Sequence, residues 1–332
     1  MRKAPPRQED NGGLPEKPKP IGDFVPHTAW PKPPSGPPPI SNPVKASEKI
    51  THRLSNTMSA PPRPTSPTKV LMLGDDSGEN RGVPNSTLLI KYAADKQQGE
   101  LTILLKQGED PNVKAAVPWQ QFETTPLFEA CVNGYARIVR ILIEHGAKLD
   151  EIVGPGYTCV YNAALNGHGK VVSMLIDAGA DPGVNTEAGM SPLYAAAQGG
   201  HGDCLVDILG SPLMTKALMN YAGNGNGATA LTVAAQNGHF ACVRELIQAG
   251  VEVNPKLSTC GSTPLHVAIF IAQRDNDKPH RDITEILLHN GADVHAKNNE
   301  GLTAIDLAKD DNSLIRLVED EKEARSKGGF WR

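Results

Sequence analysis

From residue 125 onward, the chain repeats short runs of apolar residues spaced for one face of a helix. Each run places them at positions i, i+1, i+4 and i+5, a spacing that predicts a helix with a single buried stripe. Turns rich in glycine, asparagine and aspartate separate the runs, so the pattern predicts many short helices. Two of the runs are Ile138, Val139, Leu142 and Ile143, and Val171, Val172, Leu175 and Ile176.

The residues that open the first helix of each pair also recur. A Thr or Ser hydroxyl can cap the free amides of a helix start, and Pro at the next position loses no hydrogen bond there. Glycines at 134, 167, 200 and 238 are suited to ending these helices. A period of this length predicts a stack of repeated units. The openings begin at Thr125, Thr158, Ser191, Thr229, Thr263 and Thr303, at spacings of 33, 33, 38, 34 and 40 residues.

The segments "TPLFEACVNGYARIVRILIEHGA" and "TPLHVA…DITEILLHNGADVHA" resemble ankyrin repeats, and the resemblance covers about residues 86–320. It implies an all-α solenoid of helix-turn-helix units with hairpin-like turns. We count seven units, of which the last, residues 301–320, is short and charged, as expected of a cap whose outer face meets water. We therefore predict an ankyrin repeat domain at 85–320 and a charged C-terminal tail at 321–332.

Two units are longer than the others because of insertions at residues 210–227 and 270–281. Insertions in a solenoid map to surface loops and often carry function. We expect these two segments to distinguish this protein from other repeat stacks.

Residues 1–84 hold 18 of the 28 prolines and few large apolar residues. Such a segment cannot bury enough surface to offset about 1–2 kcal/mol of backbone entropy per ordered residue. We predict a disordered Pro-rich arm.

Charge and hydropathy exclude several classes of partner. The arm carries 12 Lys/Arg and 8 Asp/Glu, and the rest of the chain carries 21 and 29. This mild asymmetry provides no basic stripe for phosphate binding, so nucleic acid is not the expected partner. No apolar run approaches the 18 residues of a membrane span, and the N-terminus lacks the apolar stretch of a signal peptide. We expect a soluble intracellular protein, cytoplasmic or nuclear.

No motif in the sequence supports catalysis or a cofactor. The glycine pairs lack the third glycine of a dinucleotide-binding loop, and no GxSxG nucleophile elbow is present. His168, His201 and His239 occupy equivalent positions in successive units, about 8–10 Å apart, which is too far for one zinc ion to join them. The resemblance instead implies that each imidazole bonds the backbone of a neighbouring loop. The five cysteines form no CxxC pair, and we expect reduced, buried thiols.

In ankyrin repeat proteins the turns and first helices form the concave binding surface, so residues around each turn glycine are the candidate contacts. Trp119 and Phe122 in "VPWQQF" are the strongest candidates, because aromatic side chains often anchor protein interfaces. The alternative role, packing against the next unit, applies above all to Tyr157 and Met190. The candidates are Trp119, Phe122, Asn133, Tyr157, Asn166, Glu187, Met190, Gln198, Asn224, Gln236, Asn237, Asn298 and Leu302.

We therefore expect a monomeric, non-catalytic scaffold or adaptor that binds another protein. The alternative is an inhibitor or targeting subunit that acts through the arm, where Arg63 precedes a PxxP segment, residues 64–67, suited to SH3 or WW domains. Ser66, before a proline, is a candidate phosphorylation site. Asn254, in "LIQAGVEVN", lies in a sequence similar to those that ankyrin asparaginyl hydroxylases modify; alternatively, it simply favours the turn.

Overall fold

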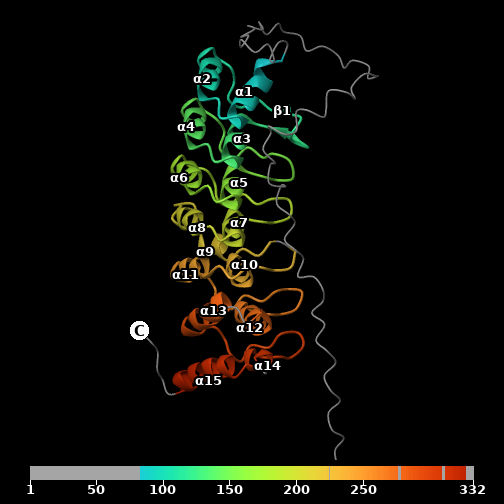
Figure 1. Cartoon of the computed structure of the whole chain (residues 1–332), viewed down its shortest axis with the longest axis vertical. Helices are drawn as coiled ribbons and strands as arrows, with labels where there is room; N and C mark the ends of the chain where they lie inside the picture. Colours follow the sequence, from blue (N-terminus) through green and yellow to red (C-terminus); the bar gives the residue numbers. More distant parts are fainter. Residues whose placement is uncertain (1–82, 224, 276–277, 309–310, 327–332) are drawn as a thin grey trace, which may run out of the picture. The chain divides into compact units, whose positions relative to one another are not determined.

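The computed structural model describes residues 83–326 except 224, 276–277 and 309–310. The expected arm therefore lies outside the described residues up to residue 82, as does the tail from residue 327. The regular secondary structure of the described chain is almost all α-helix, with one short antiparallel strand pair (Figure 1). The elements are α1 (Asn85–Ala94), α2 (Gln98–Lys106), β1 (Ala115–Ala116), β2 (Glu123–Thr124), α3 (Pro126–Val132), α4 (Ala136–Glu144), α5 (Cys159–Leu165), α6 (Gly169–Asp177), α7 (Pro192–Gly199), α8 (Gly202–Leu209), α9 (Lys216–Met219), α10 (Ala230–Gln236), α11 (Phe240–Gln248), α12 (Pro264–Asp275), α13 (Lys278–His289), α14 (Ala304–Leu307) and α15 (Asn312–Ser326).

The helices form two layers, as the sequence predicts for a solenoid. One layer contains α1, α3, α5, α7, α10, α12 and α14, each packed on the next, and the other contains α2, α4, α6, α8, α11, α13 and α15 (Figure 1). Each helix of the first layer also contacts the helix that follows it in its own unit, and the short helix α9 lies between α8 and α10 in the chain. The last helix continues past residue 320 to Ser326.

Caps at the helix starts explain why the first layer is so regular. The Thr125 hydroxyl accepts a hydrogen bond from the amide of Phe128 at 3.2 Å, and Thr158 and Ser191 make the same bond one and two units later. At the last unit Thr303 and Asp306 form a capping box, in which each side chain caps the other residue's amide. The sequence pattern at these positions is thus confirmed as capping.

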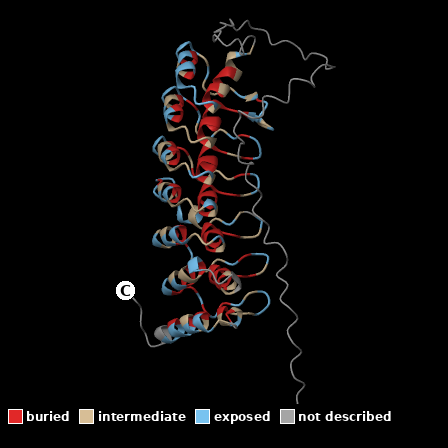
Figure 2. Cartoon of the chain, viewed as in Figure 1, coloured by how far each residue is buried: buried red, intermediate tan, exposed pale blue. Residues whose placement is uncertain are grey.

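The core is a continuous column along the first layer, which Figure 2 shows as nearly unbroken burial in α3, α5 and α7. Small residues such as Ala163, Ala164, Ala196 and Ala197 are completely buried there and let the helices approach closely. The second-layer helices bury one stripe, for example Ile138, Val139 and Leu142 in α4. The fourth residue of the predicted stripe, Ile143, is only half-buried.

A glycine and a histidine join neighbouring inner units, from the unit of α3 and α4 to the unit of α12 and α13. The Nε2 atom of His168 lies 2.9 Å from the Val132 carbonyl oxygen of the preceding unit, and His201 makes the equivalent contact with Leu165 at 3.2 Å. Gly134 has a φ of 70°, and a Cβ atom there would come within 2.5 Å of the His168 ring. The expected backbone contact of these histidines is confirmed, and it also explains why the turn requires glycine.

The first insertion adds a short extra helix, after which the chain resumes the regular contacts between units. It contains the four-residue helix α9, which Thr215 caps by accepting from the Leu218 amide at 3.3 Å. Asn220 then accepts a hydrogen bond from the Glu252 amide at 2.7 Å. Asn112 makes the same link to the Lys148 amide in an earlier unit, so Asn220 restores the regular contact between loops.

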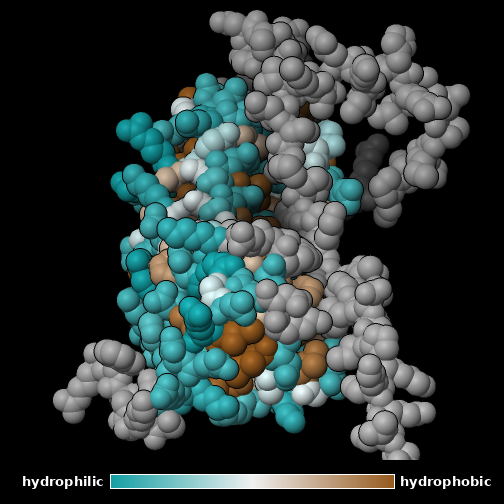
Figure 3. Space-filling view, turned by 60° about the horizontal axis from the view of Figure 1, so that its bottom comes forward, coloured by the Kyte–Doolittle hydropathy of each residue, from teal (hydrophilic) through white to brown (hydrophobic). Residues whose placement is uncertain are grey.

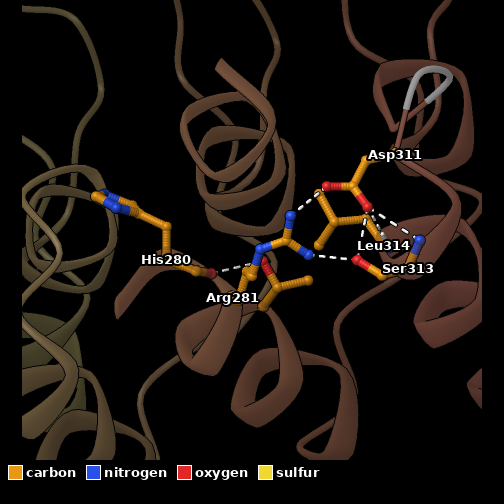
Figure 4. Close-up of polar contacts among 6 residues, drawn as sticks. His280, Arg281, Asp311, Ser313 and Leu314 are labelled. Atoms are coloured by element: carbon orange, nitrogen blue, oxygen red, sulfur yellow. Dashed lines mark hydrogen bonds and ion pairs between the residues drawn. The ribbon is translucent and has the colours of Figure 1, made fainter. Parts of the chain in front are cut away.

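The second insertion lengthens α12 and α13 to 12 residues each. His280 takes the place of the turn histidine, with its Nε2 atom 3.2 Å from the Gln236 carbonyl oxygen. The next residue, Arg281, bonds Asp311 and Ser313 at the start of α15 (Figure 4). The Asp311 carboxylate also accepts hydrogen bonds from the Ser313 hydroxyl and the Leu314 amide. The bond from Ser313 has the largest effect, and together with those from Leu314 and Arg281 it lowers the pKa of Asp311 to about 2. The insertion therefore adds a polar link to the last unit.

No helix of the described residues is long and apolar enough to cross a membrane. Within the same residues, no group of three His, Cys, Asp or Glu side chains could hold a metal ion. All five cysteines are free, and only Cys260 is not buried.

Replacing Leu175, which is 0% exposed, by alanine should lower the free energy of unfolding by about 2–5 kcal/mol, because the two layers cannot fully collapse onto the cavity. Urea denaturation followed by circular dichroism measures the change. Ile103, which is 49% exposed in α2, provides the control, since Ile103→Ala should cost far less. Equal effects of the two substitutions would contradict the assignment of Leu175 to the core.

Mild acid should destabilise the stack through its buried histidines. Burial lowers the pKa of His266 and of His201, so as the pH falls below about 6.5 the unfolded chain binds protons that the folded protein resists. The free energy of unfolding should then fall, and urea denaturation between pH 8 and 5.5 measures it. The variant His266→Gln should show a weaker pH dependence than the wild type; identical slopes would count against the role of His266.

Candidate binding surface

The hairpin of β1 and β2, residues 115–124 and called the loop below, is anchored on a buried carboxylate. Glu129 in α3 is 0% exposed and accepts three side-chain hydrogen bonds from the loop that precedes it. Its Oε1 atom accepts from the Thr124 hydroxyl at 2.8 Å and from Gln120 Nε2 at 3.0 Å, and its Oε2 atom accepts from Trp119 Nε1 at 3.2 Å. The strand register, Ala115 with Thr124 and Ala116 with Glu123, closes the loop at its base. Glu129 therefore fixes the loop from inside the core.

Burial raises the pKa of the Glu129 carboxyl, and the bonds from Thr124, Gln120 and Trp119 offset this only in part. A buried carboxylate is costly unless its oxygens are paired. Because the loop supplies all three donors, its closed conformation is coupled to the burial of Glu129.

The anchored loop presents one aromatic side chain to solvent. Trp119 remains 36% exposed although its indole nitrogen is held by Glu129. A tryptophan that is both immobilised and partly exposed is well suited to anchor a partner, since little side-chain entropy is lost on binding.

We call the loop that precedes each first-layer helix the tip of its unit. Phe122, on the same loop as Trp119, packs against the tip of the next unit. Its ring packs edge-to-face on Phe128 at 6.4 Å and lies 6.2 Å from the ring of Tyr157. A Cβ atom on Gly154, where φ is 56°, would approach Phe122 within 2.8 Å. Phe122 thus mainly packs between units and is half-buried.

Tyr157 and Met190 both contact the buried side chain of Tyr161. The Tyr157 ring stacks on Tyr161 at 5.7 Å, and the buried Tyr161 hydroxyl donates to the Met190 sulfur at 3.7 Å. Met190 is only 7% exposed, so it offers almost no surface to a partner and we leave it out of the proposed surface. Tyr157 is half-buried, so part of its side chain remains accessible.

The turn amides are tied to the backbone. Asn133 Nδ2 donates to the Glu129 carbonyl at 2.8 Å, Asn166 Nδ2 donates to the Asn162 carbonyl at 2.9 Å, and Asn237 Nδ2 donates to the Gln198 carbonyl at 3.1 Å. Of the three, Asn166 and Asn237 are exposed. Their first role is to hold the turns, with exposed side-chain edges left over.

Gln198, Gln236 and Leu302 make their contacts through the backbone, and Asn298 makes its contacts through the side chain. The carbonyl oxygens of Gln198, Gln236 and Leu302 face the ring nitrogens of turn or core histidines, at 3.0 to 3.2 Å. Asn298 uses Oδ1 to accept from the amides of Glu300 and Leu302. All four side chains are half-buried.

Neighbouring tips are joined by backbone hydrogen bonds, which makes the surface preformed. The Glu187 amide donates to the Pro155 carbonyl at 3.2 Å, and the Ser258 and Asn299 amides make corresponding bonds to Asn226 and Cys260. The side chain of Glu187 remains exposed at its tip.

Two of the sequence candidates, Asn224 and Ser66, lie outside the described residues. Asn254 is described and bridges two loops: Nδ2 donates to the Gly291 carbonyl at 3.1 Å and Oδ1 accepts from the Asp293 amide at 2.8 Å. The turn role considered for it is thus present, and its hydroxylation stays a prediction.

Sequence reasoning missed Glu129 and His280. The signal for Glu129 was a charged residue at a position where the next unit carries Asn162 and later units carry Ala195, Val233 and Val267. His280 was not recognised as a turn histidine because the insertion removes the Gly-His pair that marks the other turns.

Comparisons with known proteins agree with this architecture. A family model described as ankyrin repeats (3 copies) matches residues 89–186, 160–256 and 206–298. "Ankyrin repeat and SOCS box protein 5" of Mus musculus is 33% identical over 90 residues, which are 27% of this chain and 25% of that protein. "Protein phosphatase 1 regulatory subunit 12A" of Mus musculus is 38% identical over 86 residues, 26% of this chain and 8% of that protein. These matches span a quarter or less of those relatives.

Solved structures match over more of the chain. The human ASB11 ankyrin repeat domain aligns with a TM-score of 0.57 at 25% identity, covering 70% of this chain and 96% of that one. The ankyrin repeat domain of Bcl-3 aligns with a TM-score of 0.58 at 20% identity, covering 70% and 97%, and supports the fold alone. Ankyrin repeat proteins are generally protein–protein interaction modules. Since the family model covers well over half of the chain, this protein belongs to the ankyrin repeat family.

Proposed function

We propose that this chain is a monomeric, non-catalytic scaffold or adaptor that binds another protein through the tips and first helices of its repeats. The observation that carries the proposal is the anchoring of the partly exposed Trp119 by the buried Glu129. The binding surface then comprises Trp119 near its N-terminal end, the partly exposed side chain of Tyr157, and the exposed side chains of Asn166, Glu187 and Asn237 in later units.

Preorganisation supports this proposal physically. Ordering a loop and its side chains on binding costs about 0.5–1.5 kcal/mol per immobilised side chain. Here the Glu129 bonds and the backbone bonds between tips fix the surface before a partner arrives. One relative is, by its name, a regulatory subunit of a phosphatase, which fits a role in binding.

The alternative raised by the sequence is recognition through the Pro-rich segment around Arg63 and Ser66, which lies outside the described residues. It predicts that binding depends on Pro64 and Pro67. Variants of the full-length chain separate the two possibilities.

Glu129→Ala should open the loop at residues 115–124. The donors of Thr124, Gln120 and Trp119 lose their common acceptor, at a cost of about 1–3 kcal/mol in the free energy of unfolding. Hydrogen exchange should accelerate in the loop. Asn162→Ala is the matched control, because Asn162 occupies the same helix position one unit later, is also fully buried and receives no loop hydrogen bond within the described residues. If both variants leave the loop equally protected, Glu129 does not anchor it.

Trp119→Ala should abolish or weaken partner capture by roughly tenfold or more, the loss of an interface anchor worth at least about 1.4 kcal/mol. Affinity capture from cell extract with quantitative mass spectrometry measures this for wild type, Trp119→Ala, Ile103→Ala and the double variant Pro64→Ala/Pro67→Ala. Ile103→Ala is the control, since it removes an exposed apolar residue from the second layer. Loss of binding only in the proline variant would support the arm and reject the proposed surface.

A further inference from the structure

The last unit of the stack keeps apolar residues at positions that inner units bury completely. In the second-layer helices, the residue after the first buried one is 0% exposed in four inner units, whereas its equivalent in α15, Ile315, is half-buried. The inner residues are Val139, Val172, Leu205 and Val243.

The first layer shows the same break. The second residue after each cap is at most 1% exposed in the inner units, and its equivalent in α14, Ile305, is half-buried. Leu302 and Leu307, in the same unit, are half-buried as well. The inner residues are Leu127, Val160, Leu193, Leu231 and Leu265.

These residues form the end face of the stack, which we define as Leu302, Ile305, Leu307 and Ile315. Figure 3 shows a hydrophobic patch where the end of the stack turns forward, ringed by hydrophilic residues. The sequence predicts a polar outer face for this terminal unit, and the charges of α15, such as Arg316 and Glu319, are indeed exposed. The end face differs: it has the composition of a surface against which another apolar group packs.

We propose that the chain's own segment of residues 327–332 covers this end face, with Phe330 and Trp331 packed on Ile315 and its neighbours. The distances match. Ile315 lies eleven residues before Ser326 in α15, about 16 Å along the helix. Phe330 and Trp331 follow Ser326 by four and five residues, an extended reach of about 14–17 Å.

The composition of the segment favours a return along α15. Gly328 and Gly329 follow α15 after one intervening residue, Lys327, and glycine permits the positive φ angles with which helices end and chains reverse. Lys327 and Arg332 flank the aromatic pair and complement exposed acidic residues of α15 such as Glu319 and Asp320.

A second copy of the chain is a less suitable occupant. The end face would have to pack on a different surface of the next copy, and such head-to-tail contacts extend into open filaments unless they close. A segment already tethered beside the face reaches it at high effective concentration instead. The aromatic pair therefore serves as a built-in cap for the stack.

Hydrogen exchange of the full-length chain tests the proposal. In the double variant Phe330→Ala/Trp331→Ala, amides of α14 and α15 should exchange about tenfold faster, with α3 to α8 unchanged. The same change made in an Ile315→Ala background should have a much smaller effect, because both substitutions remove the same contact. Trp30→Ala, which removes an aromatic residue from the N-terminal segment, is the control.

Oxidative footprinting of Trp331 gives a second readout in the otherwise unaltered chain. Its labelling should be several-fold slower in native protein than in urea, and Ile305→Ala/Ile315→Ala should restore fast labelling while circular dichroism shows a folded stack. Equal labelling of Trp331 in buffer and urea, or additive effects in the exchange cycle, would overturn the proposal. So would protection that rises with protein concentration together with a dimer in analytical ultracentrifugation, because the occupant would then be a second copy.

Discussion

Every unit of this protein depends on its neighbours to bury its apolar side. Within one pair of helices there is no enclosed interior: Leu142 and Leu175 become inaccessible only because the helices before and after them are in place. Stability in such a stack is close to a sum of unit and interface contributions. The glycine and histidine contact between units makes the interface specific as well as apolar, because a side chain at Gly134 would collide with His168.

Because the faces between units provide the stability, the tips of the units are available for binding. The faces between units are constrained by packing, whereas a position such as residue 129 can be glutamate, asparagine, alanine or valine in successive units and still be buried. Glutamate at that position has a local effect: it draws Trp119, Gln120 and Thr124 inward and fixes one loop. The fold therefore determines how a surface is built, and individual residues determine what it presents.

The sequence was sufficient to predict the regular part of the structure. Caps such as Thr125, helix-ending glycines and the contacts of His168 with neighbouring backbone all follow from short-range patterns that repeat. The parts of the structure that depart from the repeat could not be predicted, because they depend on contacts that do not recur with the repeat spacing. Helix α9 and the substitution of His280 for a turn histidine arise where insertions break the spacing.

The candidate surface was harder to predict than the fold, for a related reason. The exposed fraction of a side chain in a tip depends on how closely the side chains of the neighbouring unit approach it. The spacing of residues along the sequence does not contain that distance. Met190 lies two residues before α7 and Trp119 seven before α3, yet the sequence does not show that Met190 is covered by Tyr161 while Trp119 is left 36% exposed. The buried acceptor behind Trp119 could be recognised only once the hairpin geometry brought three donors to it.

Position along the stack gives the Glu129 anchor a further significance. Units near an end of a solenoid have fewer neighbours to hold them and open more readily than central ones. The loop that carries Trp119 belongs to the second unit, with only α1 and α2 before it among the described helices. A recognition loop there cannot depend on the cooperativity of the whole stack for its shape. The side-chain bonds that fix the loop to Glu129 all lie within its own unit, between residues 119 and 129, and none of them involves α1.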